Sequence, residues 1–334
     1  MTIVCFGELL LRLTPPGNRR LVQAASLGLV AGGAEANVAA GLASLGRPVR
    51  MTSLAANNAL GDLAVNALRA VGVDTSWVAR KPGRMGLYFL EAGAGIRPST
   101  ITYDRAGSAF AEADPADIDL AGAMAGAKLL HVGGITPALG PKGGKLARAA
   151  QDAALAAGTP ISFDGNWRGN LWAAWDSRPG EILRDLAADA TLLIGNHRDI
   201  SLMLDRSYSG DTAQDRRAAA LAAFEAFPKL QLIAATGRKV MTSDHHRIIA
   251  RVDSRTDQFE TPEIDIAGIV DRIGAGDAFA TGVIHQWTLG GSLEDMARTG
   301  QALAAIKHSI PGDLCLINQA ALDAFAVEGG DIRR

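Results

Sequence analysis

Short runs of apolar residues alternate along this chain with longer stretches of helical periodicity. The runs at 3–7, 49–54, 128–132, 160–164, 191–195 and 230–235 are rich in Val, Ile and Leu without polar alternation, which is typical of strands buried on both faces. Helical patterns lie between them, at 37–45, 63–70, 144–157 and 213–227. This alternation predicts an α/β fold, a doubly wound and mainly parallel sheet with helices on both sides.

The order of elements changes after residue 235. Two short strand candidates, at 240–243 and 247–252, flank a polar turn at 244–246. Two helices are expected to follow, at 275–289 and 293–308. Because the chain shows no internal repeat and no low-complexity linker, we expect residues 1–334 to form a single domain.

Three segments in the first third of the chain do not fit a layered core. Residues 9–14 alternate in polarity and end at a Pro-Pro-Gly sequence, while 86–91 and 100–105 flank a Gly- and Pro-rich turn and predict a hairpin. Inserted at about 9–31 and 84–105, these strands are expected to form a small β-sheet. The pattern leaves two interpretations open, a lid over the active face and a surface hairpin without a function.

Composition restricts the classes of partner. The 334 residues include 33 basic and 35 acidic ones, a formal net charge of −2, with no basic face or tail, so we expect neither nucleic acid nor a membrane as a partner. No apolar run approaches the roughly 20 residues of a membrane span, and no signal peptide is expected. Cys5 and Cys315 stand at opposite ends of the chain and fit reduced thiols. We therefore expect a cytoplasmic protein.

The strongest candidate site is the segment DRIGAGDAFA at residues 271–280. Small residues turn the backbone as a helix begins, and the free N–H groups of a helix N-terminus bind anions. Gly274, Ala275 and Gly276 would form a phosphate cradle, with Asp277 in the first helical turn beside it. A carboxylate beside a phosphate makes sense if it deprotonates an attacking hydroxyl. The alternative is that the glycines close a turn and Asp277 caps the helix.

Three further polar segments follow predicted strands or open predicted helices. Gly33 and Asn37, in GGAEAN at 32–37, would admit a polyhydroxylated ligand, or would only start a helix. Arg168, in DGNWR at 164–168, would bind a carboxylate or phosphate, or form a surface salt bridge. Asn196 would contact magnesium through water, or would cap a helix.

Taken together, these segments resemble the ribokinase-like, or PfkB-type, carbohydrate kinase family. The GAGD sequence followed by AFATG at 278–282 is similar to the C-terminal signature of that family, and Gly32-Gly33 with Asn37 resembles the N-terminal one. The resemblance covers essentially the whole chain. It implies ATP-dependent phosphorylation with Mg²⁺, Asp277 as the catalytic base, residues 274–276 as an anion hole, and a β-sheet lid on a doubly wound domain.

A narrower likeness is to 2-keto-3-deoxygluconate kinases, and it is carried by residues 32–37, 86–88, 103–105, 133–137 and 163–168, with Leu171 and Trp172. Two of the three tyrosines fall in the presumed lid beside Arg105; tyrosines pack on sugars and bind their hydroxyls, and an arginine neutralises a carboxylate. A neutral sugar would leave such an arginine unpaired, so an acidic substrate is favoured. The likeness implies that the substrate contacts Gly33, Tyr88, Tyr103, Arg105 and Arg168.

This sequence departs from the pattern of that family at three places, and the likeness implies roles for further residues. Arg272 stands where a small residue is usual in a monovalent-cation loop, residues 236–239 lack the second glycine of a nucleotide loop, and Asp199 replaces a glutamate. A monovalent cation is a further candidate cofactor. The remaining site residues are expected to be Asn37, Ile135 and Asp313 for the substrate, Asn166, Asn196, Thr236, Gly237, Gly274 and Gly276 for the nucleotide, and Asn196 with Asp199 for magnesium through water.

The sequence therefore predicts transfer of the ATP γ-phosphate to the C6 hydroxyl of 2-keto-3-deoxygluconate. Kinases for a neutral sugar of the fructose or ribose type, or for a nucleoside, stay open as alternatives, as does a sugar-sensing protein without catalysis. Because exposed lid strands would have bare edges, we also expect a homo-oligomer that pairs through the lid.

Overall fold

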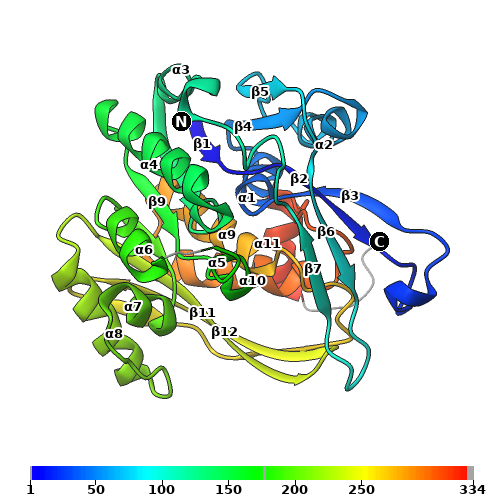
Figure 1. Cartoon of the computed structure of the whole chain (residues 1–334). Coiled ribbons are helices and arrows are strands. Elements are labelled where there is room, and N and C mark those ends of the chain that lie inside the picture. Colours follow the sequence, from blue (N-terminus) through cyan, green and yellow to red (C-terminus); the bar gives the residue numbers. More distant parts are fainter. Residues whose placement is uncertain (1, 176–177, 329–334) are drawn as a thin grey trace.

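The computed structural model describes residues 2–175 and 178–328, and it contains a large mixed sheet. The strands of this sheet are β1 (Thr2–Phe6), β4 (Val49–Ala56), β5 (Val78–Lys81), β8 (Ala127–Gly133), β9 (Ile161–Asp164), β10 (Leu192–Ile194), β11 (Leu232–Thr242), β12 (His245–Ser254), β13 (Gln258–Glu260) and β14 (Ile264–Ala267). Their order is β13-β12-β11-β10-β9-β8-β1-β4-β5, with β14 paired to β12 (Figure 1). Neighbours from β5 to β11 are parallel, and β12 to β14 add antiparallel pairs at one end. The predicted α/β class is confirmed.

Helices cover both faces of the large sheet (Figure 1). One face carries α1 (Ala34–Ser44), α2 (Ala59–Ala70), α9 (Ala275–Leu289), α10 (Leu293–Lys307) and α11 (Gln319–Glu328). The other carries α3 (Leu120–Met124), α4 (Pro141–Ala156), α6 (Pro179–Ala187), α7 (His197–Leu204) and α8 (Ala213–Ala226). Short pieces complete the described chain: α5 (Gly169–Trp172) and the 3₁₀ turns η1 (Leu21–Gln23), η2 (Pro115–Asp117) and η3 (Pro137–Leu139).

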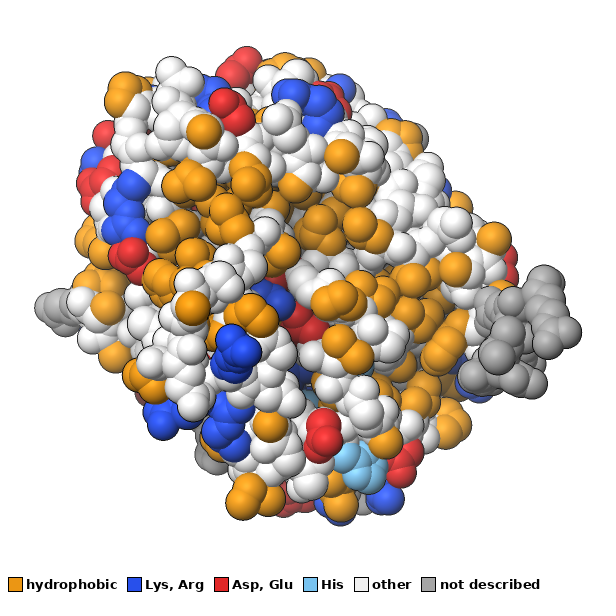
Figure 2. All heavy atoms as spheres, turned by 90° about the vertical axis from the view of Figure 1, so that its right-hand side faces the viewer, with side chains coloured by type: hydrophobic (Ala, Val, Ile, Leu, Met, Phe, Trp, Pro, Cys, Tyr) orange, Lys and Arg blue, Asp and Glu red, His pale blue; other side chains and the backbone are white. Residues whose placement is uncertain are grey.

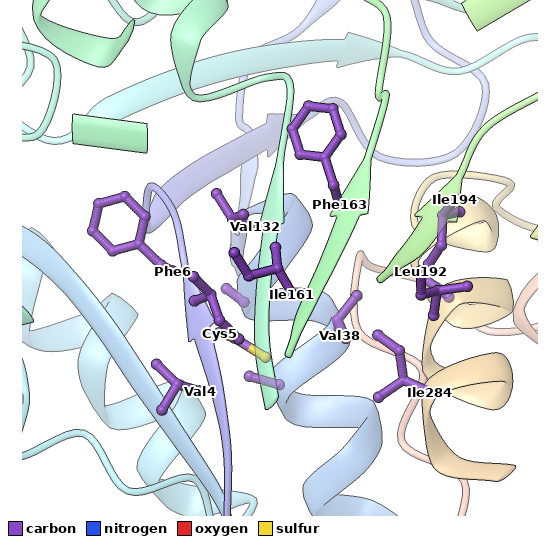
Figure 3. Close-up of a cluster of buried hydrophobic side chains, with 14 of the residues drawn as sticks. Val4, Cys5, Phe6, Val38, Val132, Ile161, Phe163, Leu192, Ile194 and Ile284 are labelled. Carbon is purple, nitrogen blue, oxygen red and sulfur yellow. The ribbon is translucent and has the colours of Figure 1, made fainter. Parts of the chain in front are cut away.

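The central strands are apolar on both faces because helices bury both of them. Phe6 of β1 and Val132 of β8 are fully buried, and Val38 of α1 and Ile284 of α9 join the same cluster from one helical layer (Figure 3). This two-sided burial explains why the sequence shows continuous apolar runs in place of alternation. The described helices include none that is long and apolar enough to cross a bilayer.

A second, four-stranded sheet stands beside the large one. Its strands are β2 (Leu10–Thr14), β3 (Gly28–Gly32), β6 (Gly86–Glu91) and β7 (Thr100–Asp104), in the order β3-β2-β6-β7 (Figure 1). β6 and β7 pair as an antiparallel hairpin, whereas β2 is parallel to β6 and antiparallel to β3. Leu10, Tyr88 and Leu90 on its inner face pack with Ile273, just before α9. This packing favours the lid interpretation over a surface hairpin without a function.

Several element boundaries differ from the sequence-based expectation. β11 continues through residues 236–239, where a nucleotide loop was expected, because these residues pair with β12 in a ribbon that extends past the core. The turn between the two strands is correspondingly shorter, at Ser243 and Asp244. β5, β13 and β14 were not predicted as strands, since they are short and lack an apolar run, and β3 was not singled out within the insertion expected at about 9–31. α2 begins four residues early because the Asn58 side chain accepts hydrogen bonds from the N–H groups of Leu60 and Gly61.

Candidate active site

A cavity of about 840 Å³ lies at the carboxyl ends of the parallel strands, beneath the small sheet. In a doubly wound fold this is the edge at which ligands bind. The predicted residues that line it are Gly33, Asn37, Tyr88, Tyr103, Arg105, Ile135, Arg168, Asn196, Thr236, Gly237, Gly274, Ala275, Gly276, Asp277 and Asp313. Asn166 and Asp199 do not line it; they line an adjoining cavity of about 230 Å³, which shares Gly276 and Asp277 with the larger one.

The predicted phosphate cradle is the loop that starts α9. Gly274 is the N-cap residue with φ 81°, and a Cβ there would lie 2.1 Å from the Asp313 carbonyl oxygen, so only glycine fits. A Cβ on Gly276 would meet nothing within 4 Å. The Ala275 N–H donates to the Arg272 carbonyl oxygen at 3.2 Å, whereas the N–H groups of Gly276 and Asp277 find no acceptor in the part of the chain that the structure describes. These two amides are free to bind an anion.

The Asp277 carboxylate is oriented by a side chain from the other end of the sequence. Asn37 Nδ2 donates to Asp277 Oδ2 at 2.6 Å, and no hydrogen bond to the start of α9 holds the carboxylate as a cap. Burial raises the pKa of Asp277 to about 6, although the Asn37 hydrogen bond and the charge of Arg168 act in the opposite direction. A carboxylate with a pKa near the working pH is suited to general-base catalysis.

Two further carboxylates form an acidic corner in the smaller cavity. Burial raises the pKa of Asp164 well above its usual range, and the negative charges of Asp277 and Asp199 raise it further. Asp199 accepts a hydrogen bond from the Asn196 N–H at 2.8 Å, and Asn196 Oδ1 accepts one from the Arg198 N–H at 2.8 Å. Asn196 therefore caps α7, which was one of its two predicted alternatives. It also lies on the rim of a site that would favour a cation. Asp164 was not among the predicted site residues, although its place as the last residue of β9 was a usable signal.

Four arginines on the main cavity have no carboxylate partner within 4 Å among the described residues: Arg168, Arg198, Arg238 and Arg272. The Arg168 guanidinium donates only to the carbonyl oxygen of Trp167, at 3.0 Å. Burial lowers the pKa of Arg272, and the charge of Arg168 lowers it further. Unpaired guanidinium groups that converge on one cavity are stabilised when an anion binds there.

Arg105 is not the unpaired arginine that the sequence predicted. Its Nε and Nη2 atoms lie 2.7 and 2.6 Å from Glu8 Oε2, and Ser108 Oγ donates to Glu8 Oε1 at 2.6 Å. Arg105 is 4% exposed and Glu8 2%. The argument that a neutral sugar would leave Arg105 unpaired is therefore wrong, because Glu8 neutralises it. Only Nη1 lacks a partner in the described residues.

The two lid tyrosines lie side by side on the cavity wall. The ring centroids of Tyr88 and Tyr103 are 6.3 Å apart, and the Arg105 guanidinium lies 6.0 Å from the Tyr103 ring. Tyr88 donates its hydroxyl hydrogen to Asp313 Oδ2 at 2.6 Å. Burial raises the pKa of Asp313, although Arg12 and the Tyr88 hydrogen bond act in the opposite direction. The pair offers an aromatic wall with a polar end, which suits a sugar chain.

A buried ionic network, which was not predicted, connects the lid to the cradle. Arg12 of β2 contacts Asp271 Oδ2 at 2.6 Å and Asp313 Oδ1 at 2.9 Å. Asp271 also accepts hydrogen bonds from the N–H groups of Ile273 and Gly312, both at 3.0 Å. One carboxylate therefore fixes the loop before α9, the loop after α10 and a lid strand at once. An inward-facing arginine in an alternating strand was the only available signal.

Comparison with known proteins places this site in a family. The sequence pattern of the pfkB family carbohydrate kinases matches residues 1–314. The structure of 2-dehydro-3-deoxygluconokinase from Thermotoga maritima superposes with a TM-score of 0.93 at 34% identity, covering 98% of both chains. In sequence, 2-dehydro-3-deoxygalactonokinase from Haloferax volcanii is 30% identical over 98% of this chain and 97% of its own length. 2-Dehydro-3-deoxygluconokinase from Bacillus subtilis is 30% identical over 84% and 82%. This chain therefore belongs to the pfkB family of carbohydrate kinases.

Proposed function

We propose that this protein transfers the γ-phosphate of ATP to the C6 hydroxyl of 2-keto-3-deoxygluconate, in the cytoplasm. The observation that carries the proposal is that the Asp277 carboxylate and two free backbone amides share one cavity with unpaired arginines and an aromatic wall. The names of the similar proteins, which denote kinases of 2-dehydro-3-deoxy sugar acids, support the same substrate class. The two buried free cysteines fit a reducing compartment.

The chemical step needs a base, an attacking oxygen and charge stabilisation. Asp277 accepts the proton of the C6 hydroxyl as the bond from that oxygen to the γ-phosphorus forms and the bond from phosphorus to the ADP oxygen breaks. The Gly276 and Asp277 amides stabilise the negative charge on the transferred group. Asn37 leaves one Asp277 oxygen for the proton because it holds the other.

The nucleotide side of the cavity is assigned to Thr236 and Gly237 of β11, to Asn166 and to Asn196. Arg238 and Arg272 are placed to offset triphosphate charge. The described residues contain no cluster of three or more metal-ligating side chains, and Mg²⁺ usually keeps several waters and binds substrate phosphates. The acidic corner fits such an ion, with Asn196 and Asp199 acting through water. Bound magnesium would neutralise phosphate charge.

Recognition of the sugar acid is assigned mainly to Arg168. Its positive charge acts on the pKa of Asp277 in the direction opposite to burial, and its guanidinium has no carboxylate partner among the described residues. Arg105 contributes the two N–H donors of Nη1, which has no partner among the described residues, and no net charge beyond its pair with Glu8. Tyr88, Tyr103 and Asp313 would bind the hydroxyl groups of the chain.

The direct test is a panel of acceptors in a coupled assay of ADP release. We expect kcat/KM for 2-keto-3-deoxygluconate, or for its C4 epimer 2-keto-3-deoxygalactonate, to exceed that for fructose, ribose and nucleosides by at least about 10²-fold, since the charge-assisted contact with Arg168 is lost with neutral acceptors. A higher kcat/KM for a neutral sugar would contradict the substrate class. Binding of a sugar without any ADP release would indicate a sensing protein.

Arg168→Ala is expected to raise KM for the sugar acid by about 10- to 100-fold, because one hydrogen-bonded charge contact is lost. KM for ATP and the unfolding temperature should change little, since the side chain is exposed and has only one backbone hydrogen bond. Arg206→Ala, which removes an exposed arginine outside the cavity, is the control. An unchanged KM for the acid in Arg168→Ala would contradict the carboxylate assignment.

We further propose that residues 1–334 act as one domain with the small sheet as its lid, and that two copies pair through this lid. Leu29 and Val30 on the edge strand β3, with Val22 and Ile96 in adjoining segments, are exposed hydrophobic residues. Figure 2 shows hydrophobic side chains gathered in a broad band across the side on which this sheet lies. Such a patch favours association. A monomeric mass at micromolar concentration by light scattering would rule this pairing out.

A further inference from the structure

Lys307, the last residue of α10, has a fully buried side chain, with 0% exposed. A buried ammonium group costs several kcal/mol unless its charge and its N–H donors are satisfied. Within residues 2–175 and 178–328, no carboxylate lies within salt-bridge distance of Lys307; its Nζ donates to the Ile310 carbonyl oxygen at 2.8 Å and to the Asp271 carbonyl oxygen at 3.3 Å. Nothing in the mechanism so far uses this charge.

The two carbonyl groups belong to the two loops that shape the phosphate cradle. Asp271 begins the segment that leads to Gly274, and Ile310 lies in the segment after α10 that leads to Asp313. At Gly274 a Cβ would lie 2.1 Å from the Asp313 carbonyl oxygen and 3.5 Å from Lys307 Cε. The lysine side chain is therefore directly behind the turn whose amides face the cavity.

The family resemblance implies a monovalent cation in this loop, and the residues present do not fit one. Cations such as K⁺ are bound by backbone carbonyl oxygens, and here the Asp271 and Ile310 carbonyl oxygens already accept hydrogen bonds from an ammonium group. A second positive charge within a few ångströms would be repelled, because the protein around a buried site screens charges far less than water does. Arg272, in the same loop, adds a further positive charge.

We propose that the Lys307 ammonium group is the internal cation of the phosphate cradle, which ties its two loops together and makes an external monovalent cation unnecessary. The proposal rests on the proposed phosphoryl transfer at this site. Lys307 is a positioning residue, since it acts through Asp271 and Ile310. Burial lowers the pKa of Lys307, while the charges of Asp271 and Asp313 act in the opposite direction.

The wild-type protein provides the first test, which needs no variant. At constant ionic strength, kcat in potassium, sodium, caesium and choline chloride is expected to agree within about twofold, since the cation is built in. A tenfold or greater dependence on potassium would overturn the proposal. If no acceptor is phosphorylated in any salt, the proposed function fails, and the unfolding temperatures of the second test still apply because they require no turnover.

The second test replaces the lysine and supplies a small cation. Lys307→Ala is expected to lower kcat by about 10- to 100-fold through displaced cradle amides. Ammonium, methylammonium or potassium ions should restore activity in a saturable way and should also raise the unfolding temperature of the ligand-free variant, as ligands of the native state do. Neither effect is expected for wild-type protein, nor with choline.

Lys307→Met is the matched control, because it fills the side-chain space as far as the Cε position without a charge and so leaves far less room for an ion than Lys307→Ala does. It should lose activity without rescue. Should both variants fold and be indifferent to ammonium and potassium in activity and in unfolding temperature, Lys307 only fills space and the proposal fails. If Lys307→Ala does not fold, the wild-type salt series decides the question.

Discussion

Asp277→Asn is expected to lower kcat by about 10²- to 10⁴-fold or more, because the substitution removes the proton acceptor. The fold should be kept: the asparagine side chain has nearly the same shape, and its oxygen can still accept the hydrogen bond that Asn37 donates. The measurement is ADP release with 2-keto-3-deoxygluconate at saturating ATP, with circular dichroism to verify folding. Near-normal turnover in Asp277→Asn would remove the basis of the kinase mechanism proposed above.

Asp295→Asn is a matched control for this variant. Asp295 occupies the corresponding position in the first turn of α10, where it accepts hydrogen bonds from Ser292 N–H and Oγ at 2.9 and 2.7 Å and caps the helix. We expect this substitution to reduce stability slightly and to leave kcat unchanged. Similar activity losses in the two variants would indicate that Asp277 acts as a cap and not as a base.

The assignment of Asp277 as the base also determines how kcat/KM and stability change with pH. Since the pKa of Asp277 is raised to about 6, kcat/KM should fall as the pH drops below about 6 and this group is protonated. The sign for stability is the opposite: a carboxyl whose pKa is raised by folding stabilises the fold at low pH, and this contribution is lost as the pH rises through 6. Asp277→Asn should therefore be at least as resistant to heat as wild type at pH 8.

Glu35 is the carboxyl group most easily confused with Asp277 in such a profile. Burial raises its pKa to about 7, and the charge of Asp277 raises it further, against the backbone N–H groups of Glu35 and Gly133 and the charge of Arg105. Glu35 lines neither cavity. The acid limb of kcat/KM should persist in Glu35→Gln; if it disappears there, Asp277 is not the group that titrates.

Arg105→Met is expected to destabilise the fold by roughly 3 to 5 kcal/mol, because it leaves the buried Glu8 carboxylate without its cation. Ser108 alone would remain as a hydrogen-bond donor to Glu8. This loss is expected to exceed any specific effect on sugar binding, since Arg105 carries no net charge beyond that pair. The measurement is the free energy of unfolding from a denaturant titration at pH 7.5, with KM for the sugar acid determined on the folded fraction.

Two further variants test whether the loss of stability comes from the unpaired Glu8 carboxylate or from a general sensitivity of the lid to substitution. The double variant Glu8→Gln with Arg105→Met removes both charges and should recover part of the loss. Arg84→Met breaks the Arg84–Asp104 pair in the same sheet, which is about half exposed, and should cost only about 0 to 1 kcal/mol. If Arg105→Met is as stable as wild type and only raises KM for the acid, Arg105 is a direct ligand of the carboxylate.

The sequence by itself determined the architecture and the chemical centre. Two-sided apolar runs at 3–7 and 128–132 predicted buried parallel strands, because only strands covered on both faces carry such runs. The cradle was also predictable, since a glycine with positive φ at position 274 and a carboxylate three residues later are local properties of a helix start. Features that depend only on neighbouring residues, such as the start of a helix, can be predicted from the sequence.

Only the tertiary structure decided which charges are paired and which are free. Glu8 and Arg105 are 97 residues apart and Arg12 and Asp271 are 259 apart, so no spacing rule connects them. Lys307 lies near the end of the helix predicted at 293–308, and only the structure shows that its ammonium group is buried behind the cradle. The physical reason is that the energy of a charge depends on its burial and on the groups within a few ångströms, and folding brings those groups from anywhere in the chain.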